Sequence, residues 1–112
     1  MGESMSGATE EVVVVASMKV MPDRKDEVRS ALVRQVERVH AEEPGALLFA
    51  AHEAGDRLVL IEKWDSPESL QMHASGEAIA EYRRVLDSAL LEPADIQIMK
   101  SLPAGDPQKG SL

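Results

Sequence analysis

Residues 58–73 read LVLIEKWDSPESLQMH, and this stretch decides the fold class. Its first half, Leu58–Trp64, begins with four consecutive apolar residues and ends on a tryptophan, which predicts a β-strand. Ser66 followed by Pro67 predicts the start of a helix, because serine caps the free N–H groups and proline fits the first turn. A strand that passes directly into a helix is therefore expected here.

The residues before this stretch predict a further strand, a helix and a hairpin partner. Val12–Val20 is a largely β-branched run, which predicts a first strand. Asp23 is expected to cap a helix that ends near Glu43, because Pro44–Gly45 cannot continue it. Ala46–Glu53 predicts a second strand, which a short polar turn joins to the strand at 58–64. The helix is expected to bury an apolar face that consists of Val28, Leu32, Val36 and Val39.

The residues after this stretch predict an interrupted helix and a last strand. Ser75 and Gly76 weaken the helix, so a kink or two short helices are expected there. Pro93 ends the helical region, and Ile96–Met99 is expected to form the last strand. The order strand, helix, strand, strand, helix, strand is that of a ferredoxin-like βαββαβ sandwich, an α+β fold with one antiparallel sheet. The inner helix face is expected to carry Leu70, His73, Ile79, Tyr82, Leu86 and Ala89.

The pattern predicts one domain at residues 12–102 between disordered tails at 1–11 and 103–112. Two helices can cover only one face of the sheet. The other face of the first and third strands is also largely apolar, so it needs an outside partner. We therefore expect a homodimer in which the uncovered sheet faces pack together.

Composition excludes several classes of function. The formal net charge of -8 argues against nucleic acid or an anionic membrane as partner. With Cys 0 there is no thiolate nucleophile and no cysteine metal site. Glycine-rich nucleotide motifs, a nucleophile elbow and clustered metal ligands are all missing, so no cofactor and no metal are expected. Residues 1–11 lack the basic start and apolar run of a secretory signal, and we expect a cytoplasmic protein.

Trp64 and His73 are the two residues that most suggest a binding site. Trp64 is the only tryptophan, and an indole at a strand end beside an interrupted helix suits the wall of a site for a flat aromatic ligand. The alternative is that it fills the core between sheet and helix. His73 shares the inner helix face with Leu70 and can exchange a proton near neutral pH, as a catalytic base does. The alternative is a structural histidine.

Four further residues are candidates for substrate contact or catalysis. Glu62 follows the same strand face as Trp64, and either orients His73 or forms an ion pair. Tyr82 and Arg83 offer a phenol and a cation to an oxyanion, but neighbouring helix residues point about 100° apart, so one of them is expected on the surface. Ser17 is a candidate where the second face of the first strand turns polar. His40 and His52 are expected at the surface.

The run Leu60–Ser66, followed by Glu68, Leu70 and His73, resembles the hallmark segment of the antibiotic biosynthesis monooxygenase domain family. The likeness spans residues 12–102 and includes the segments Met21–Pro22, Glu43–Gly45 and Leu91–Pro93. It implies a homodimer of ferredoxin-like subunits, a dimeric α+β barrel, with a pocket between sheet and helices. Characterised members oxidise quinols or anthrones with molecular oxygen and without flavin or metal. Others degrade haem or isomerise small sugars.

The resemblance also assigns roles to particular residues. Trp64 matches the pocket tryptophan, and Arg83 lies where the anthrone-oxidising branch has an arginine. That branch has an asparagine at the position of Leu60 and a tyrosine at the position of Leu70, so this chain departs from it. The haem-degrading branch uses an asparagine, and this chain has none. The Leu70 to His73 spacing instead resembles the branch that includes quinol monooxygenases.

The leading hypothesis is a cofactor-independent monooxygenase that acts on a quinol-like or phenolic aromatic molecule and O2. His73 and Arg83 would be catalytic, and Trp64, Glu62 and Tyr82 would contact the substrate, with Ser17 as a further contact. Two alternatives remain open: a non-catalytic small-molecule binding or sensor protein, and an isomerase of a small metabolite.

Overall fold

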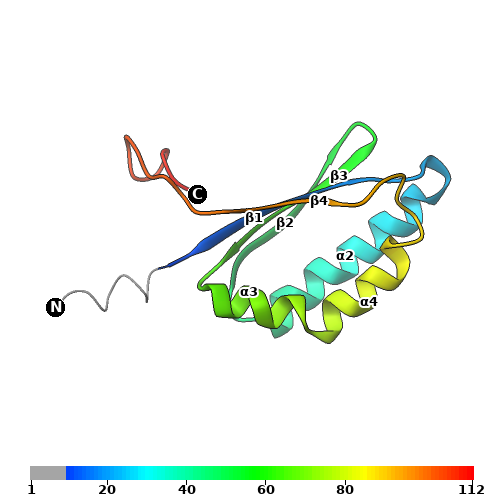
Figure 1. The fold of residues 1–112 in the computed structure, drawn as a ribbon, viewed down its shortest axis with the longest axis horizontal. Helices are drawn as coiled ribbons and strands as arrows, with labels where there is room; N and C mark the ends of the chain where they lie inside the picture. Colours follow the sequence, from blue (N-terminus) through cyan, green and yellow to red (C-terminus); the bar gives the residue numbers. More distant parts are fainter. Residues whose placement is uncertain (1–9) are drawn as a thin grey trace.

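The apolar strand β1, Val12–Lys19, is one of the two inner strands of the sheet in a computed structural model that describes residues 10–112. It pairs antiparallel with β3, Arg57–Trp64, on one side and with β4, Asp95–Met99, on the other. The strand β2, Ala46–Ala54, pairs with β3 and completes the order β2-β3-β1-β4 (Figure 1). This order confirms the predicted ferredoxin-like α+β fold.

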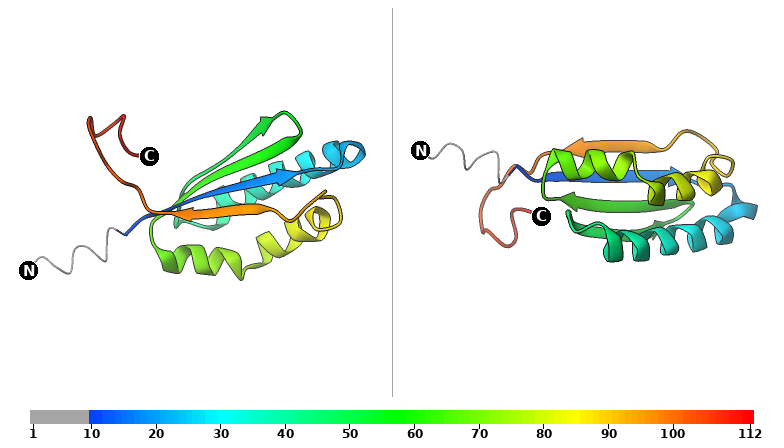
Figure 2. Two further views of the ribbon diagram at one scale, coloured as in Figure 1. Left: turned by 45° about the horizontal axis from the view of Figure 1, so that its top comes forward. Right: turned by 90° about the horizontal axis from the view of Figure 1, so that it is seen from below.

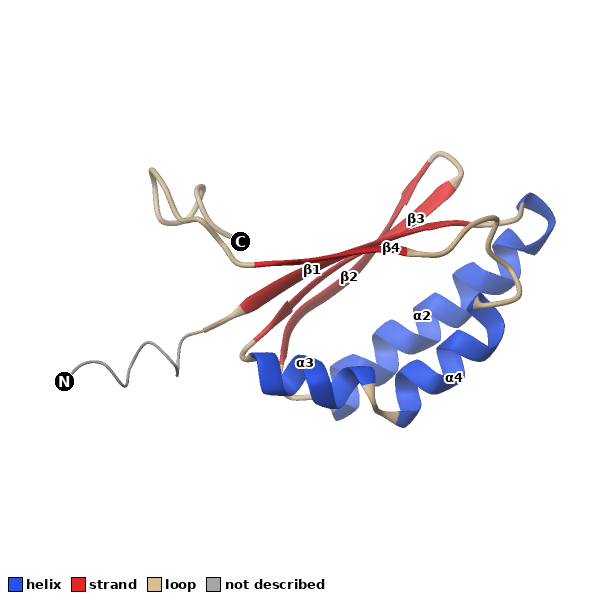
Figure 3. Ribbon diagram, viewed as in Figure 1, coloured by secondary structure: helices blue, strands red, loops and turns tan. Residues whose placement is uncertain are grey.

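All helices lie on one face of this sheet (Figure 3). A 3-10 helix at Pro22–Arg24 leads into α2, Lys25–Glu42, which packs on β2. The helix α3, Pro67–Ala74, and the helix α4, Glu77–Leu86, lie beneath the β1 and β4 side of the sheet (Figure 2). The predicted interruption at residues 75–76 is confirmed, because the chain forms two short helices there.

The starts of α2 and α3 differ in how they are capped. Ser66 caps α3 as predicted, since its Oγ accepts a hydrogen bond from the backbone N–H of Ser69 at 3.1 Å. The prediction that Asp23 caps α2 is wrong. Asp23 lies inside the short 3-10 helix, and the residue that precedes α2 is Arg24, which makes no side-chain cap bond. Pro22 allows this tighter turn because its missing N–H needs no partner.

The core lies between the helices and the sheet. Alternate residues of β1 and β3 point toward the helices and are buried with the inner face of α2. The predicted apolar face of α2 packs on the core, with Val36 partly buried, and it also contains Gln35, which was not predicted and is buried with 3% exposure. The buried residues of α2 are Val28, Ala31, Leu32, Gln35 and Val39.

The opposite sheet face carries no helix in the part of the chain that the structure describes. Val15, Val59 and Ile61 point to this face and are partly exposed. No described helix is long and apolar enough to cross a membrane.

The predicted tails are described only in part. Residues 1–9, most of the predicted N-terminal tail, lie outside the described residues. Residues 100–112 form neither helix nor strand, and they turn back so that the carbonyl oxygen of Leu112 accepts a hydrogen bond from Lys63 Nζ at 2.6 Å. The boundaries of the domain, and the disorder of the tails, stay a prediction.

We predict that Ser66→Ala lowers the free energy of unfolding by about 1 kcal/mol, because one N–H group at the start of α3 loses its acceptor. Urea titration followed by circular dichroism measures this change. The control is Ser101→Ala, in the irregular C-terminal segment, which should stay within 0.5 kcal/mol of the parent, the usual range for surface changes. Equal stability of both variants would contradict the capping role.

Candidate functional site

A cavity of about 650 Å³ opens between the helix face of the sheet and the helices α3 and α4. Its walls are mainly apolar and include Val14, Leu60, Leu70, Ile79 and Leu86. Gln35, Glu62, His73, Tyr82 and Arg83 bring polar atoms to it. An apolar cavity with a few polar groups is the usual form of a small-molecule site.

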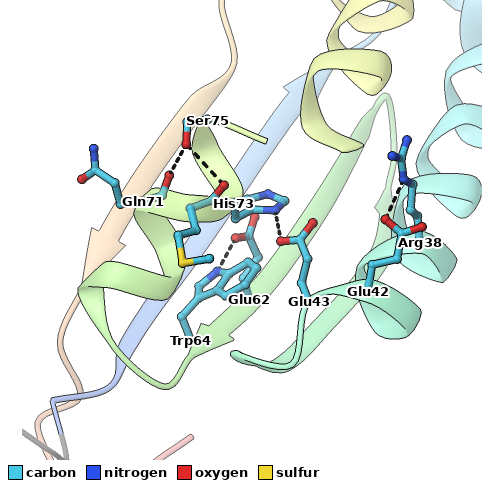
Figure 4. Close-up of polar contacts among 9 residues, drawn as sticks. Arg38, Glu42, Glu43, Glu62, Trp64, Gln71, His73 and Ser75 are labelled. Atoms are coloured by element: carbon cyan, nitrogen blue, oxygen red, sulfur yellow. Dashed lines mark hydrogen bonds and ion pairs between the residues drawn. The ribbon is translucent and has the colours of Figure 1, made fainter. Parts of the chain in front are cut away.

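His73 lines this cavity and is held by Glu43, the residue that ends α2 (Figure 4). The ring atom Nδ1 lies 2.8 Å from Glu43 Oε1. An ionised carboxylate can only accept a hydrogen bond, so Nδ1 carries the proton and Nε2 of a neutral ring is left as an acceptor. His73 itself is only 3% exposed. The arrangement thus places an oriented base in the wall of the cavity.

Glu43 and His73 are adjacent because two chain corners are joined. The backbone N–H of Asp65, at the end of β3, donates to the carbonyl oxygen of Gly45 at 2.9 Å. A Cβ atom at Gly45 would collide with the side chain of Ser69 in the first turn of α3. Glycine therefore allows the corner after α2 to approach the corner before α3.

Glu62 is a buried carboxylate on β3, and Trp64 satisfies it. The indole Nε1–H of Trp64 donates to Glu62 Oε1 at 2.8 Å. Burial raises the pKa of Glu62, while the hydrogen bond from Trp64 opposes that rise. The predictions that Glu62 orients His73 or forms an ion pair are therefore wrong: Glu43 orients the histidine, and Glu62 accepts from the indole.

Phe49, Trp64 and His73 form an aromatic cluster around these carboxylates. The ring centroids of Trp64 and His73 are 4.7 Å apart, and Phe49 packs edge-on against both. Trp64 is 1% exposed and is not among the residues that line the main cavity. It lies instead beside a smaller pocket near Gly45. Its contacts fix Glu62 and the ring of His73.

Tyr82 lies in the cavity wall with its hydroxyl group turned to β1. Its O–H donates to Met18 Sδ at 3.1 Å, and a thioether is a weak acceptor. Burial, and next the negative charge of Glu62, raise the pKa of Tyr82 above its ordinary value. The phenol therefore stays protonated at neutral pH and can act as a hydrogen-bond donor.

Most of the sequence matches the model of one protein family. The family model for antibiotic biosynthesis monooxygenases matches residues 11–85. This range includes β3 and nearly all of the helices α2, α3 and α4, which bring Gln35, Glu62, His73, Tyr82 and Arg83 to the cavity. The chain belongs to the antibiotic biosynthesis monooxygenase family. The family resemblance predicted from the segment around Trp64 is thereby confirmed.

Similar proteins come from several bacteria. An uncharacterised protein of Synechocystis is 27% identical over 103 residues, which cover 89% of this chain and 69% of that protein. Rv0793 of Mycobacterium tuberculosis has a TM-score of 0.79 at 23% identity, over 86% of this chain and 99% of that one. A candidate antibiotic biosynthesis monooxygenase of Caulobacter crescentus has a TM-score of 0.80 at 17% identity, over 91% and 99% of the two chains. At these identities the two structures support the fold.

Of the other site residues predicted from the sequence of this family member, Arg83 lines the cavity and Ser17 does not. Arg83 is exposed while Tyr82 is buried, so the expectation that one of the two lies on the surface is confirmed, although both line the cavity. Neighbouring residues of a helix point about 100° apart, so α4 places Tyr82 inside the cavity and Arg83 at its rim. Ser17 lies on the opposite sheet face, where its Oγ accepts a hydrogen bond from Arg57 at 3.3 Å. It is therefore not part of this cavity. His40 and His52 are exposed, as predicted.

Two site residues were missed in the sequence. Glu43 was considered only as the end of a helix, yet a carboxylate just before Pro44–Gly45 is a recognisable feature of the chain. Gln35 follows Val28 and Leu32 at helical spacing, and a polar residue within an apolar stripe is the signal that marks it.

We predict that Glu62→Gln changes how stability depends on pH. The folded protein holds the Glu62 proton more tightly than the unfolded chain, whose pKa is near 4.5. The stability that Glu62 contributes is therefore complete below the unfolded pKa and is lost as pH rises through the folded pKa. Glutamine does not titrate, so the wild-type protein should lose stability relative to Glu62→Gln across this window.

Urea unfolding at a series of pH values measures this difference. Glu37→Gln, at an exposed position on α2, is the matched control and should follow the wild-type curve. Parallel curves for wild type and Glu62→Gln would contradict the raised pKa of Glu62.

Proposed function

We propose that this protein is a monooxygenase that oxidises a quinol-like or phenolic aromatic molecule with O2 and without a cofactor. The observation that carries the proposal is the Glu43–His73 pair in the wall of a mainly apolar cavity. Membership of the monooxygenase family supports the reaction class. The size and lining of the cavity support an aromatic substrate, because apolar walls favour a flat ring.

The first step is removal of a proton from the substrate. Nε2 of His73 accepts the proton of a substrate O–H group, and Glu43 stabilises the imidazolium that forms. The pair thus resembles the base and its orienting carboxylate in other enzymes that activate hydroxyl groups. Trp64 acts indirectly, since it packs on His73 and binds Glu62.

The second step is electron transfer to O2 from the deprotonated substrate. A phenolate is electron-rich and can reduce O2 within the cavity. One oxygen atom is retained in the product, and the other leaves as water with two protons from the substrate. The substrate supplies all four electrons, so no external reductant enters the balance.

Charge on the substrate oxygen is stabilised by two neighbours of the cavity. Arg83 offers a permanent cation at the rim. Tyr82 offers a neutral phenol, which its raised pKa keeps protonated, once its O–H turns from the weak acceptor Met18 Sδ to the substrate. Donors placed at a developing oxyanion lower the barrier without moving a proton themselves.

His73→Ala should reduce turnover by about a hundredfold or more, the usual scale for the loss of a positioned base. Oxygen uptake with a panel of naphthohydroquinones and hydroxylated aromatics measures turnover, and the melting temperature is taken on the same preparation. His52→Ala, at an exposed histidine, is the matched control and should retain full activity.

Three outcomes would count against this function. Full activity in a folded His73→Ala variant would show that His73 is not the catalytic base. Tight binding of these aromatics by wild type, with no oxygen uptake, would favour the binding or sensor alternative. A product of unchanged mass formed without oxygen would favour an isomerase.

We propose further that two copies of the chain pack through their uncovered sheet faces. Val15, Val59 and Ile61 make the centre of this face apolar and partly exposed. A second copy offers the same apolar surface, and twofold pairing of one patch with itself is the commonest way to cover it. The lack of a helix on this face in residues 10–112 supports the arrangement.

Val15→Glu should convert the dimer to a monomer, because it places a charge at the centre of the apolar face. Sedimentation velocity at micromolar concentration measures the assembly. Val33→Glu introduces the same charge on α2, where Val33 is 49% exposed, and should leave the dimer intact. A wild-type monomer under these conditions would refute the proposed assembly.

A further inference from the structure

Gln35 is a buried polar residue whose amide lacks a partner. Its side chain is 3% exposed, and Nε2 is the one buried side-chain nitrogen or oxygen atom in residues 10–112 without a hydrogen bond. A buried donor left unpaired lowers the stability of a fold, whereas an apolar residue of similar shape at the same position would not. Gln35 thus has no structural advantage over leucine or methionine in the protein alone.

Gln35 lines the cavity, although Nε2 itself has almost no accessible surface in the free protein, so its donor reaches a ligand once the side-chain amide rotates toward the cavity. The residue lines the 650 Å³ cavity together with Glu62, His73 and Tyr82. It also borders a cleft between α2 and α4. Because it stands on the inner stripe of α2, it faces the cavity from the helix opposite His73, which belongs to α3.

The surrounding charges restrict what can bind to this amide. Glu62 lines the same cavity and Glu43 lies behind His73, so an anionic ligand group at this depth would meet carboxylates. Among the described residues that line the cavity, Arg83 is the one permanent cation, and it is exposed at the rim. The amide N–H is therefore suited to an uncharged acceptor.

We infer that Gln35 is a specificity-determining residue whose Nε2–H binds a neutral carbonyl oxygen at the buried end of the ligand. The substrate class is thereby narrowed to aromatic molecules that carry a carbonyl oxygen in addition to the hydroxyl group that His73 deprotonates. This inference rests on the proposed function for the identity of the site. Binding measurements without turnover can test it separately.

The test compares two probes of similar shape, 1,4-naphthoquinone and 1,4-dimethylnaphthalene, which differ in having carbonyl oxygens or methyl groups. Trp64, the single tryptophan, packs on His73 and reports binding by its fluorescence. Covalent addition to thiols does not interfere, because the chain has no cysteine. Wild type should bind the quinone more tightly than the hydrocarbon.

The deciding variant is Gln35→Met, which keeps the side-chain length and removes the donor. Its preference for the quinone should fall by about tenfold, the value of one neutral hydrogen bond, while binding of the hydrocarbon stays unchanged. Its melting temperature should rise by several degrees, because the unpaired buried amide is gone. Gln71→Met makes the same change at an exposed position on α3, outside the cavity, and should alter neither quantity.

Several results would overturn the inference. They are an unchanged preference in Gln35→Met, equal losses for both probes, or no preference in wild type. Gln35→Leu provides the same comparison if the methionine variant does not fold. Oxygen uptake is measured in parallel with hydroxylated substrates. If Gln35→Met keeps the preference for the quinone while the wild type consumes oxygen, only the inference about Gln35 is contradicted. If the wild type prefers the quinone but consumes no oxygen with any hydroxylated substrate, only the proposed oxidation is contradicted.

Discussion

The structure depends on one constraint: polar groups buried between the helices and the sheet lose their contact with water, so each one lowers stability unless it finds another partner. Glu62 accepts from the indole of Trp64, and His73 is held by Glu43. Each contact satisfies a group whose burial would otherwise cost several kcal/mol, of the order known for unpaired buried polar groups. The same contacts leave the proton-accepting nitrogen of His73 for a ligand.

The two halves of the fold meet at this polar cluster. Glu43 belongs to the end of α2, whereas His73 belongs to α3, and the hydrogen bond from Asp65 to Gly45 holds their chain corners together. A chemical unit is thus formed by residues 30 positions apart in the sequence. The arrangement combines stability and function, since the hydrogen bond that orients the base also satisfies a buried ring nitrogen.

The fold was largely predictable from local patterns. The apolar run that begins at residue 58, the Ser66–Pro67 helix start and the weak point at residues 75–76 are properties of short segments, and each was confirmed. The prediction that Asp23 caps α2 was wrong, because Pro22 starts a short 3-10 helix that takes up Asp23 before α2 begins. Gln35 was not predicted on the buried face of α2, although it follows Leu32 at helical spacing, because only apolar residues were expected there.

The sequence by itself determined the order of the elements, the family and the residue types available for chemistry, because periodicity and turn residues act over a few neighbours. Only the tertiary structure decided which residues meet. It paired His73 with Glu43, placed Trp64 behind Glu62 and separated Ser17 from the cavity. The physical reason is that a hydrogen bond depends on distances within about 3 Å, and such distances between remote segments are set by packing that no local pattern contains.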